Sequence, residues 1–244
     1  MSQSDATHLV CLKWGSKYPA EYVNRLYRMV AANLTHPFTF HCLTESTEGL
    51  LPEINVLPLK RNDLEGWWYK LSLFQQDFYG LQGQIIYLDL DVVITANIDF
   101  LVEMPGDFVI IQNWSRNAMW NSSVMRFPVG KYHAVWESFL TDKARVLKDF
   151  HGDQEWIFAC VPEAHVWPAD KVVSYKKSLN AKAYPRLSKL KLPCFQKATD
   201  AMDTALTPGA AIVIFHGKPD PEDVADGPYG PWKKASFIQR AWSV

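Results

Sequence analysis

The chain has 244 residues, of which 48% are hydrophobic, 14% aromatic and 21% charged, and its formal net charge is -1. This composition excludes a disordered chain, because so much apolar side chain can be buried to offset chain entropy. The near-zero charge argues against attraction to nucleic acid along the whole chain, so we expect no nucleic-acid partner. The length suits one large α/β domain, or at most two small ones.

The order of the predicted elements indicates an α/β sheet. The first half is predicted to contain a strand at 8–13, a helix at 20–34, strands at 38–43 and 54–59, a helix at about 66–79 and an apolar strand at 84–90. The second half is predicted to contain strands at 107–112 and 123–127, a helix at about 131–150, a buried strand at 210–215 and a closing helix at 232–242. Because strands and helices alternate at first, we expect a mixed, mostly parallel central sheet. No repeat or flexible linker divides the chain, which predicts a single domain over 1–244.

Cysteine spacing and the N-terminal residues indicate a compartment. Cys11, Cys42, Cys160 and Cys194 lie far apart and form no C-x-x-C pair, so neither a zinc knuckle nor a redox motif is indicated. The start of the chain lacks a basic stretch followed by an apolar one, and no window approaches the ~18 to 20 apolar residues of a membrane span. We therefore expect reduced thiols and a cytoplasmic location.

The sharpest local signal is IIYLDLDVVI at 85–94, where Asp89 and Asp91 interrupt an apolar run. Carboxylates two residues apart point to the same side of an extended chain, and this pair is unfavourable at a strand end without a cation. Mg²⁺ or Mn²⁺ would neutralise the pair and bridge to a phosphate. The alternative is a solvated turn capped by Asp91. We favour a metal site, since α/β sheets bind ligands beyond the carboxyl ends of their strands.

A second segment, AAIVIFHGKPDP at 210–221, places His216 at the end of another predicted buried strand. Imidazole can complete a metal shell begun by two carboxylates, Gly217 lets backbone approach a ligand, and Lys218 supplies positive charge for a phosphate. A histidine at a strand end is more often structural when it stands alone. Beside two aspartates that need further ligands, a ligand role explains His216 better.

Two weaker segments carry polar side chains. Asn121, Ser122 and Ser123 precede a predicted strand and can hydrogen-bond sugar hydroxyls, although Asn-Ser-Ser is also ordinary turn chemistry. Asp153 and Gln154 begin a predicted helix, and the simplest interpretation is that Asp153 is its N-cap. Neither segment indicates a function by itself.

Together, the order and spacing of these segments resemble GT-A glycosyltransferases related to glycosyltransferase family 8 and glycogenin. The resembling motifs are YKLSLF at 69–74, YLDLD at 87–91, NSSVMRF at 121–127, GDQ at 152–154 and FHGKP at 215–219. The resemblance runs from about Leu9 to Pro219. It implies one Rossmann-like GT-A domain with a nucleotide-binding half at about 1–100 and an acceptor-side half at about 101–244. The consecutive run His216–Lys218, and Ser123 in place of the usual glycine, point to a divergent bacterial-type subgroup.

The resemblance also implies roles for individual residues. Asp89 and Asp91 would bind Mn²⁺ or Mg²⁺, with His216 as the third protein ligand. Asp153 and Gln154 would lie on the reactive side of the anomeric carbon as the catalytic residues. The residues implied in binding the nucleotide sugar are Asp89, Lys70, Asn121 and Lys218, together with Leu12 and Lys13 of the first strand, Leu9–Trp14, which would cradle the base and ribose.

The implied activity is metal-dependent transfer of a sugar from a nucleotide sugar, expected to be a UDP-sugar, with retention at the anomeric carbon. A glycan or lipid-linked saccharide is the expected acceptor. A covalent intermediate on Asp153 and a front-side route resembling an ion pair both fit the sequence.

Three alternatives remain. A phosphatase of the haloacid-dehalogenase type would use the DLDVV strand, but that strand lies some ninety residues into the chain instead of near its start. A nucleotidyltransferase would need a Gly-rich phosphate loop after the first strand, and none is present. The third is a non-catalytic sugar-binding protein with the same fold, which would not require the aspartates, His216 and Lys218 together.

Two further features bear on partners. The segment 171–197 contains eight basic residues and no acidic one. Such a run is usually a solvated face, but beside a sugar-nucleotide site we expect it to attract an anionic acceptor or the cytoplasmic surface of a membrane. Four tryptophans flank the proposed donor site, and we expect most of them to fill the core instead of stacking on an acceptor. They are Trp67, Trp68, Trp114 and Trp120.

Overall fold

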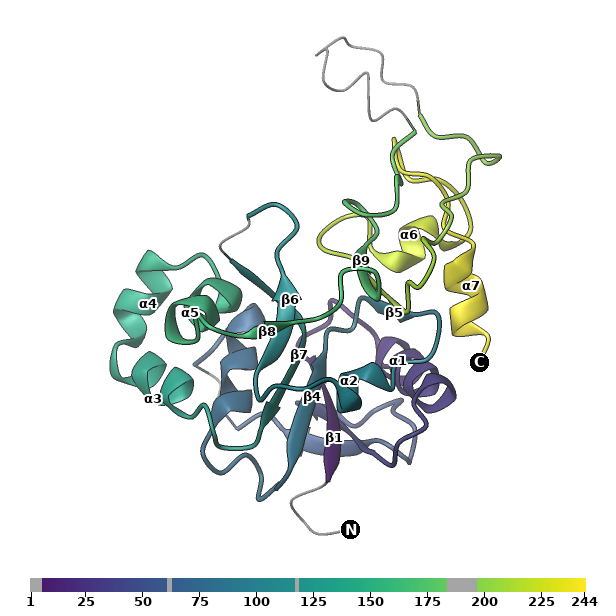
Figure 1. Cartoon of the computed structure of the whole chain (residues 1–244). Helices are drawn as coiled ribbons and strands as arrows, with labels where there is room; N and C mark the ends of the chain where they lie inside the picture. The colour runs from purple at the N-terminus through teal and green to yellow at the C-terminus, as the bar shows by residue number, and fades with distance from the viewer. Residues whose placement is uncertain (1–5, 61–62, 117–118, 184–196) are drawn as a thin grey trace. The chain divides into compact units, whose positions relative to one another are not determined.

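The computed structural model describes residues 6–60, 63–116, 119–183 and 197–244 (Figure 1). Contacts between residues divide the chain into two compact units, and each is described by itself. The described residues of the first unit fall within 1–24, 36–90 and 99–167, and those of the second within 25–35, 91–98 and 168–244.

A seven-stranded sheet in the order β3-β2-β1-β4-β7-β6-β8 forms the centre of the first unit. Its strands are β1 (Thr7–Lys13), β2 (Thr39–Thr44), β3 (Asn55–Pro58), β4 (Gln84–Leu88), β6 (Val109–Gln112), β7 (Trp120–Pro128) and β8 (His165–Val166). Strands β3, β2, β1 and β4 are parallel neighbours, β7 is antiparallel to β4 and β6, and β8 is parallel to β6. The predicted mixed, mostly parallel α/β sheet is confirmed.

The continuous apolar run of β4 explains its central place, because residues on both faces of the strand are buried. Ile85 and Tyr87 point to one face of the sheet, where they join an aromatic-rich core, and each is at most 1% exposed. In that core Phe74 stacks on Phe127 with ring centroids 4.5 Å apart, and Phe108 stacks on Phe127 at 5.6 Å. Such offset aromatic packing fixes the position of the chain segments that carry it.

Helical elements of the first unit are shorter than predicted. They are the 3-10 helix η2 (Gly66–Phe74) and the α-helices α2 (Phe100–Glu103), α3 (Ala134–Thr141), α4 (Lys143–Asp149) and α5 (Asp153–Cys160). The helix predicted to reach residue 79 ends at Phe74, because Gln75 takes up an extended conformation with ψ of 141°. The helix predicted at 131–150 is two helices, since Asp142 leaves helical geometry at φ -129° and ψ 34°.

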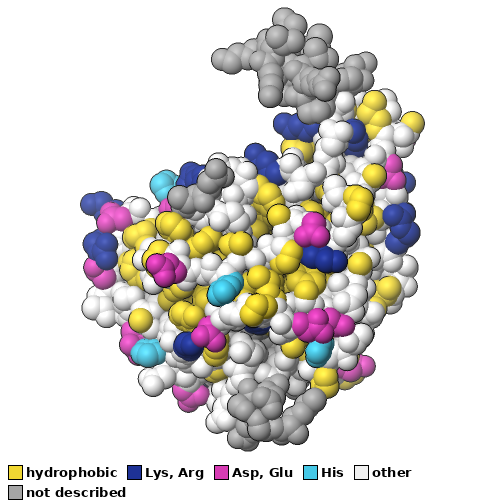
Figure 2. Space-filling view, in the orientation of Figure 1, with side chains coloured by type: hydrophobic (Ala, Val, Ile, Leu, Met, Phe, Trp, Pro, Cys, Tyr) yellow, Lys and Arg dark blue, Asp and Glu magenta, His cyan; other side chains and the backbone are white. Residues whose placement is uncertain are grey.

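Around α4, Lys and Arg side chains alternate with Asp and Glu side chains on the surface (Figure 2).

Two strand boundaries also differ from prediction. Strand β4 ends at Leu88, two residues early, and residues 90–91 form a turn. Strand β7 begins at Trp120 and spans nine residues, because it pairs with β4 on one side and β6 on the other. Asn121 and its two serine neighbours therefore lie inside a strand, and the prediction that they precede it is wrong.

The second unit contains a small sheet in the order β5-β10-β9. Its strands are β5 (Val92–Ile94), β9 (Val172–Ser174) and β10 (Ile212–Ile214), and its helices are α6 (Pro221–Ala225), α7 (Phe237–Trp242) and the part of α1 (Ala20–Asn33) from residue 25 onward. Strand β10 pairs antiparallel with β5 and parallel with β9. Within the described ranges, no helix combines the length and apolar character needed to cross a membrane.

Candidate functional site

The candidate site of the first unit begins where β4 ends. Asp89 follows the last strand residue, and its backbone N–H donates to the carbonyl of Ser123 on β7 at 2.9 Å. Its carboxylate Oδ1 accepts a hydrogen bond of 2.6 Å from the hydroxyl of Tyr87, two residues earlier on the same face of β4. The strand therefore places one carboxylate at the carboxyl end of the sheet, held by a buried phenol.

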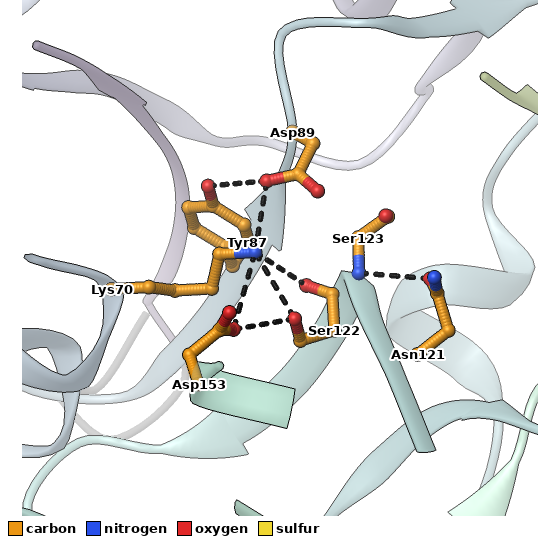
Figure 3. A network of polar contacts seen from close by, with 7 residues as sticks. All are labelled: Lys70, Tyr87, Asp89, Asn121, Ser122, Ser123 and Asp153. Carbon is orange, nitrogen blue, oxygen red and sulfur yellow. Dashed lines mark hydrogen bonds and ion pairs between the residues drawn. The ribbon is translucent and has the colours of Figure 1, made fainter. Parts of the chain in front are cut away.

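Lys70 brings a buried positive charge to this carboxylate. The residue lies on η2 and is only 4% exposed. Its Nζ lies 3.0 Å from Asp89 Oδ1 and 3.4 Å from Asp153 Oδ2, and it donates a 3.1 Å hydrogen bond to Ser122 Oγ. Figure 3 shows the ammonium group at the centre of these groups. A buried ammonium is tolerated because it has charged and polar partners.

Asp153 completes the cluster from α5. It is the first residue of that helix, after the N-cap Gly152, so the interpretation of Asp153 as the N-cap is wrong. Its carboxylate is turned into the protein, where Oδ2 accepts a 2.6 Å hydrogen bond from Ser122 Oγ. The serine hydroxyl thus accepts from Lys70 and donates to Asp153, which fixes both side chains.

The electrostatics of the cluster follow from burial and charge. Burial raises the pKa of Asp153 above its ordinary value, more than Lys70 and the Ser122 hydrogen bond lower it. Burial alone would lower the pKa of Lys70, but the charges of Asp153 and Asp89 outweigh it and the pKa is raised. The pKa of Tyr87 is raised well above its usual range by burial and then by the charge of Asp89. Lys70 and Tyr87 therefore stay protonated at neutral pH.

Asn121 and Gln154 are the sequence neighbours of two cluster residues, Ser122 and Asp153. Asn121 is buried, and its Oδ1 accepts the backbone N–H of Ser123 at 3.1 Å, outside the ring of contacts around Lys70 (Figure 3). Gln154 is half-buried on α5 beside Asp153. Their predicted roles toward a donor sugar and the anomeric carbon stay predictions.

The end of β1 carries the residues expected to cradle a nucleotide. Leu12 is 7% exposed and part of the core. The Nζ of Lys13 donates to the carbonyl of Gly15 at 3.2 Å, in the turn after the strand. Trp14 follows at the surface and is 38% exposed. A contact of Leu12 or Lys13 with a donor stays a prediction.

In the second unit, His216 follows β10 as expected from the sequence. Its Nε2 lies 2.8 Å from Ser174 Oγ at the end of β9. Lys176 donates to the carbonyls of His216 and Gly217, at 2.7 Å each, and to that of Lys218. Burial, followed by the charge of Lys176, lowers the pKa of His216. The ammonium group of Lys176 thus fixes the backbone of His216–Lys218 through three hydrogen bonds.

The ammonium group of Lys218 forms ion pairs with two neighbouring carboxylates. Its Nζ lies 3.1 Å from Asp220 and 2.8 Å from Asp223, and hydrogen bonds to these groups raise its pKa. The predicted contact of Lys218 with a diphosphate stays a prediction. Of the basic segment 171–197, residues 184–196 lie outside the described part of the chain.

The residues predicted to bind a metal are shared between the units: Asp89 belongs to the first, and Asp91 and His216 to the second. The metal centre therefore stays a prediction. A different group of possible ligands, His36, Asp99 and Glu103, converges within the first unit, with His36 Nε2 3.2 Å from Glu103 Oε1. Glu103 is exposed and the group resembles a common surface ion pair, so it carries no functional weight here.

Sequence reasoning missed Tyr87 and did not connect Ser122 with Lys70. The signal for Tyr87 was its position two residues before Asp89 on a buried strand, which puts both side chains on one face. The signal for Ser122 was weaker, because its role depends on β7 pairing with β4.

Of the four tryptophans expected to lie mostly in the core, only Trp120 is buried, and Trp68 and Trp114 are half-buried. Trp120 is 7% exposed and donates its indole N–H to the carbonyl of Val161 at 2.8 Å. Trp68 stacks on Phe139 with an interplanar angle of 8°. Trp67, in contrast, is 54% exposed.

No protein-family model matches the sequence, and no curated protein matches it. Several solved structures, in contrast, are similar to this chain in fold. The apo form of the glycosyltransferase GlyE of Streptococcus pneumoniae TIGR4 is similar at 11% identity and a TM-score of 0.65, over 98% of this chain and 60% of GlyE. The galactosyltransferase LgtC in complex with donor and acceptor sugar analogues is similar at 11% identity and a TM-score of 0.63, over 97% of this chain and 96% of LgtC. An active-site mutant of LgtC, with glutamate in place of a glutamine, matches at 12% identity and a TM-score of 0.61, over 97% of this chain and 95% of that one.

These likenesses show that the chain has the GT-A glycosyltransferase fold, as the resemblance implied. The chain spans about three fifths of the length of GlyE, at 60% coverage.

Proposed function

We propose that this chain is a glycosyltransferase that moves a sugar from a nucleotide sugar, expected to be a UDP-sugar, to a hydroxyl of a glycan or lipid-linked saccharide. The observation that carries the proposal is the cluster of Lys70, Asp89 and Asp153 at the carboxyl end of β4 in a GT-A sheet. Open α/β sheets bind their ligands at this edge. LgtC, which has a similar fold, was solved with donor and acceptor sugar analogues, which supports a two-substrate reaction.

We propose Mn²⁺ or Mg²⁺ as the cofactor, bound by Asp89, Asp91 and His216. The chemistry of this donor set, two carboxylates and an imidazole, suits such a cation. Tyr87 and Lys70 both contact Asp89 through Oδ1, and its side chain remains 26% exposed. In Figure 3 no contact with the other drawn side chains is marked at the second oxygen of Asp89, so we propose that the carboxylate serves Lys70 and a further cation at once. When bound, the metal supplies Lewis-acid stabilisation of a departing diphosphate.

The remaining steps are assigned to side chains. Asn121 and Lys70 orient the donor, and Leu12 and Lys13 lie beside its nucleoside. The positive charge of Lys218 stabilises the negative charge that develops on the leaving diphosphate. Asp153, with its neighbour Gln154, stabilises positive charge at the anomeric carbon. An active-site glutamine in LgtC lends support to Gln154. We propose net retention of configuration.

The alternatives fare less well. The GT-A fold disfavours a haloacid-dehalogenase-type phosphatase, whose nucleophile would sit in the DLDVV strand. A sugar-binding protein without turnover would not need a buried lysine between two carboxylates.

The test is a panel of nucleotide sugars, with and without Mn²⁺, in which release of nucleoside diphosphate is followed for the native chain. Release from one sugar that depends on Mn²⁺ and is lost in Asp91→Asn, but kept in the surface variant Asp149→Asn, is the expected result. Product NMR then reports the anomeric configuration. Hydrolysis of a phosphate ester without turnover of any nucleotide sugar refutes the proposal.

We further propose that the protein acts in the cytoplasm and that the segment 171–197 attracts anionic acceptors or an anionic membrane surface. Co-sedimentation with vesicles of anionic lipid should fall as salt is raised and should fall further in Lys177→Gln/Lys182→Gln. Binding that is independent of salt contradicts this assignment.

A further inference from the structure

The strongest feature of the first unit that has no assigned role is the contact of the Trp67 indole with Gly152. This indole is 54% exposed, although Trp68 beside it stacks on the core. A Cβ placed on Gly152 would lie 3.0 Å from Nε1 and 3.4 Å from Cδ1 of Trp67, so the indole edge rests directly on the glycine. Gly152 is buried beneath it.

Gly152 is needed for space and not for backbone conformation. Its φ of -178° and ψ of 175° are extended values that any residue adopts. A methyl group there would require the indole to shift by a few tenths of an ångström, because contacts of 3.0 and 3.4 Å are tighter than ordinary Cβ contacts. The missing side chain therefore serves the position of Trp67.

This position is next to the reacting groups of the proposed function. Gly152 is the N-cap of α5, and Asp153 follows it with its carboxylate turned inward to Lys70. Trp67 therefore contacts the residue that immediately precedes Asp153. A ring that lies on the open face of the indole would approach the carboxylate cluster from the solvent side.

The other exposed indole helps to separate two sites. Trp14 lies at the end of β1, where a nucleoside is expected, and its ring carbons lie 3.7 and 3.9 Å from a Cβ placed on Gly66. Gly66 precedes Trp67, so Trp14 packs against the start of the segment that carries Trp67, whereas Trp67 itself packs against Gly152 at the start of α5. Because Trp67 lies at the α5 end, beside Asp153, its partner is the second substrate and not the base.

We propose that Trp67 is the stacking platform for a pyranose ring of the saccharide acceptor, positioned by Gly152. The proposal rests on the glycosyltransferase function proposed above. A pyranose presents an apolar C–H face that packs on a flat indole, while its hydroxyls remain available to polar groups at the ring edge. Trp67 then determines which acceptor is used and leaves donor chemistry unchanged.

The experiment uses the full chain with methyl β-D-galactoside, methyl β-D-glucoside and lactose as acceptor probes. Saturation-transfer NMR measures their binding without turnover, and donor hydrolysis in water is measured separately. We expect Trp67→Ala to weaken binding and raise the acceptor KM about tenfold, with donor hydrolysis within about twofold of native. Trp67→Phe should restore most of the binding.

Gly152→Ala gives an independent readout, because it displaces the indole without removing it. We expect it to raise the acceptor KM in the same direction, whereas Gly227→Ala, whose Cβ would meet only an ordinary 3.8 Å contact, should not. Tyr229→Ala, which removes an aromatic ring that is 43% exposed in the second unit, is the matched control for Trp67→Ala.

The outcomes separate the two proposals. If the native chain binds none of the three probes, or if Trp67→Ala binds them as well as native, the platform is refuted even when donor hydrolysis is intact. If native protein binds a probe through Trp67 but no nucleotide sugar is hydrolysed or transferred, the catalytic function fails and the saccharide platform stands.

Discussion

Replacing Lys70 by methionine tests the central cluster. The substitution keeps much of the side-chain volume but removes an ammonium that lies 3.0 Å from Asp89 and 3.4 Å from Asp153. Removing one partner of a buried ion pair costs about 3 to 5 kcal/mol, because the other charge stays buried and uncompensated. Asp153 is 5% exposed, but the side chain of Asp89 is 26% exposed and partly solvated. We therefore expect the lower end, about 3 kcal/mol at neutral pH.

The loss should depend on pH through Asp153. Because its folded pKa is raised above 3.8, the stability that protonation of Asp153 contributes is fully present below that value and is lost as pH rises through the folded pKa. Without Lys70 the pKa of Asp153 rises further, so the carboxyl group of the variant stays neutral to a higher pH. The deficit of Lys70→Met should then be smaller at about pH 5 than at about pH 8.

Urea unfolding followed by fluorescence of the 10 tryptophans measures both effects. Lys143→Met is the matched control, since Lys143 pairs with Asp63 at 2.6 Å where the two side chains are 25% and 43% exposed. That pair should be worth less than about 1 kcal/mol. A deficit in Lys70→Met no larger than in Lys143→Met, or one that does not change with pH, would refute the reasoning.

Three further predictions concern backbone groups. Arg126 is 4% exposed and donates to four backbone carbonyls, so Arg126→Lys should lower the unfolding free energy by about 2 to 4 kcal/mol in urea; a loss below 1 kcal/mol, by the same hydrogen-bond scale, contradicts this. Gly83→Ala would place a Cβ 2.2 Å from a backbone carbonyl oxygen, so its thermal unfolding should fall well below that of Gly80→Ala, which meets no atom within 4 Å; equal midpoints would rule out the contact. Lys176→Met should speed amide hydrogen exchange in the turn whose carbonyls it holds, whereas Lys177→Met should not; unchanged exchange would show that the turn does not depend on Lys176.

The sheet could be predicted because its signals are local. Each of the strands β1, β2 and β4 is a short apolar run, and alternation with helical segments indicates parallel order. Their ends were less accurate: β4 stops at Leu88 because the chain turns at residues 90–91, although the N–H of Asp89 still donates to a β7 carbonyl. The break at Asp142 divides a helix whose apolar pattern is continuous in sequence.

The cluster could be predicted only in part. Asp89, Asp153 and Lys70 were each singled out, but on grounds that treat them separately: a strand end, a helix start and a motif resemblance. Their mutual contact depends on η2, β4 and α5 converging from distant parts of the chain, which no spacing encodes. Residue periodicity reports which face of an element is buried, and it does not report which buried polar groups meet.

The convergence bears on the route of reaction. A carboxylate that is already bound by an ammonium and a hydroxyl is a weaker nucleophile than a free one, because both contacts stabilise the negative charge that an attack would consume. The two contacts of Asp153 use the same oxygen, Oδ2, so its negative charge is held on the side that faces Lys70 and Ser122. Such a group is better suited to stabilising a positive anomeric centre by its field than to forming a bond with it. For the function proposed here, the geometry of Lys70 and Ser122 therefore favours the front-side route over a covalent intermediate on Asp153.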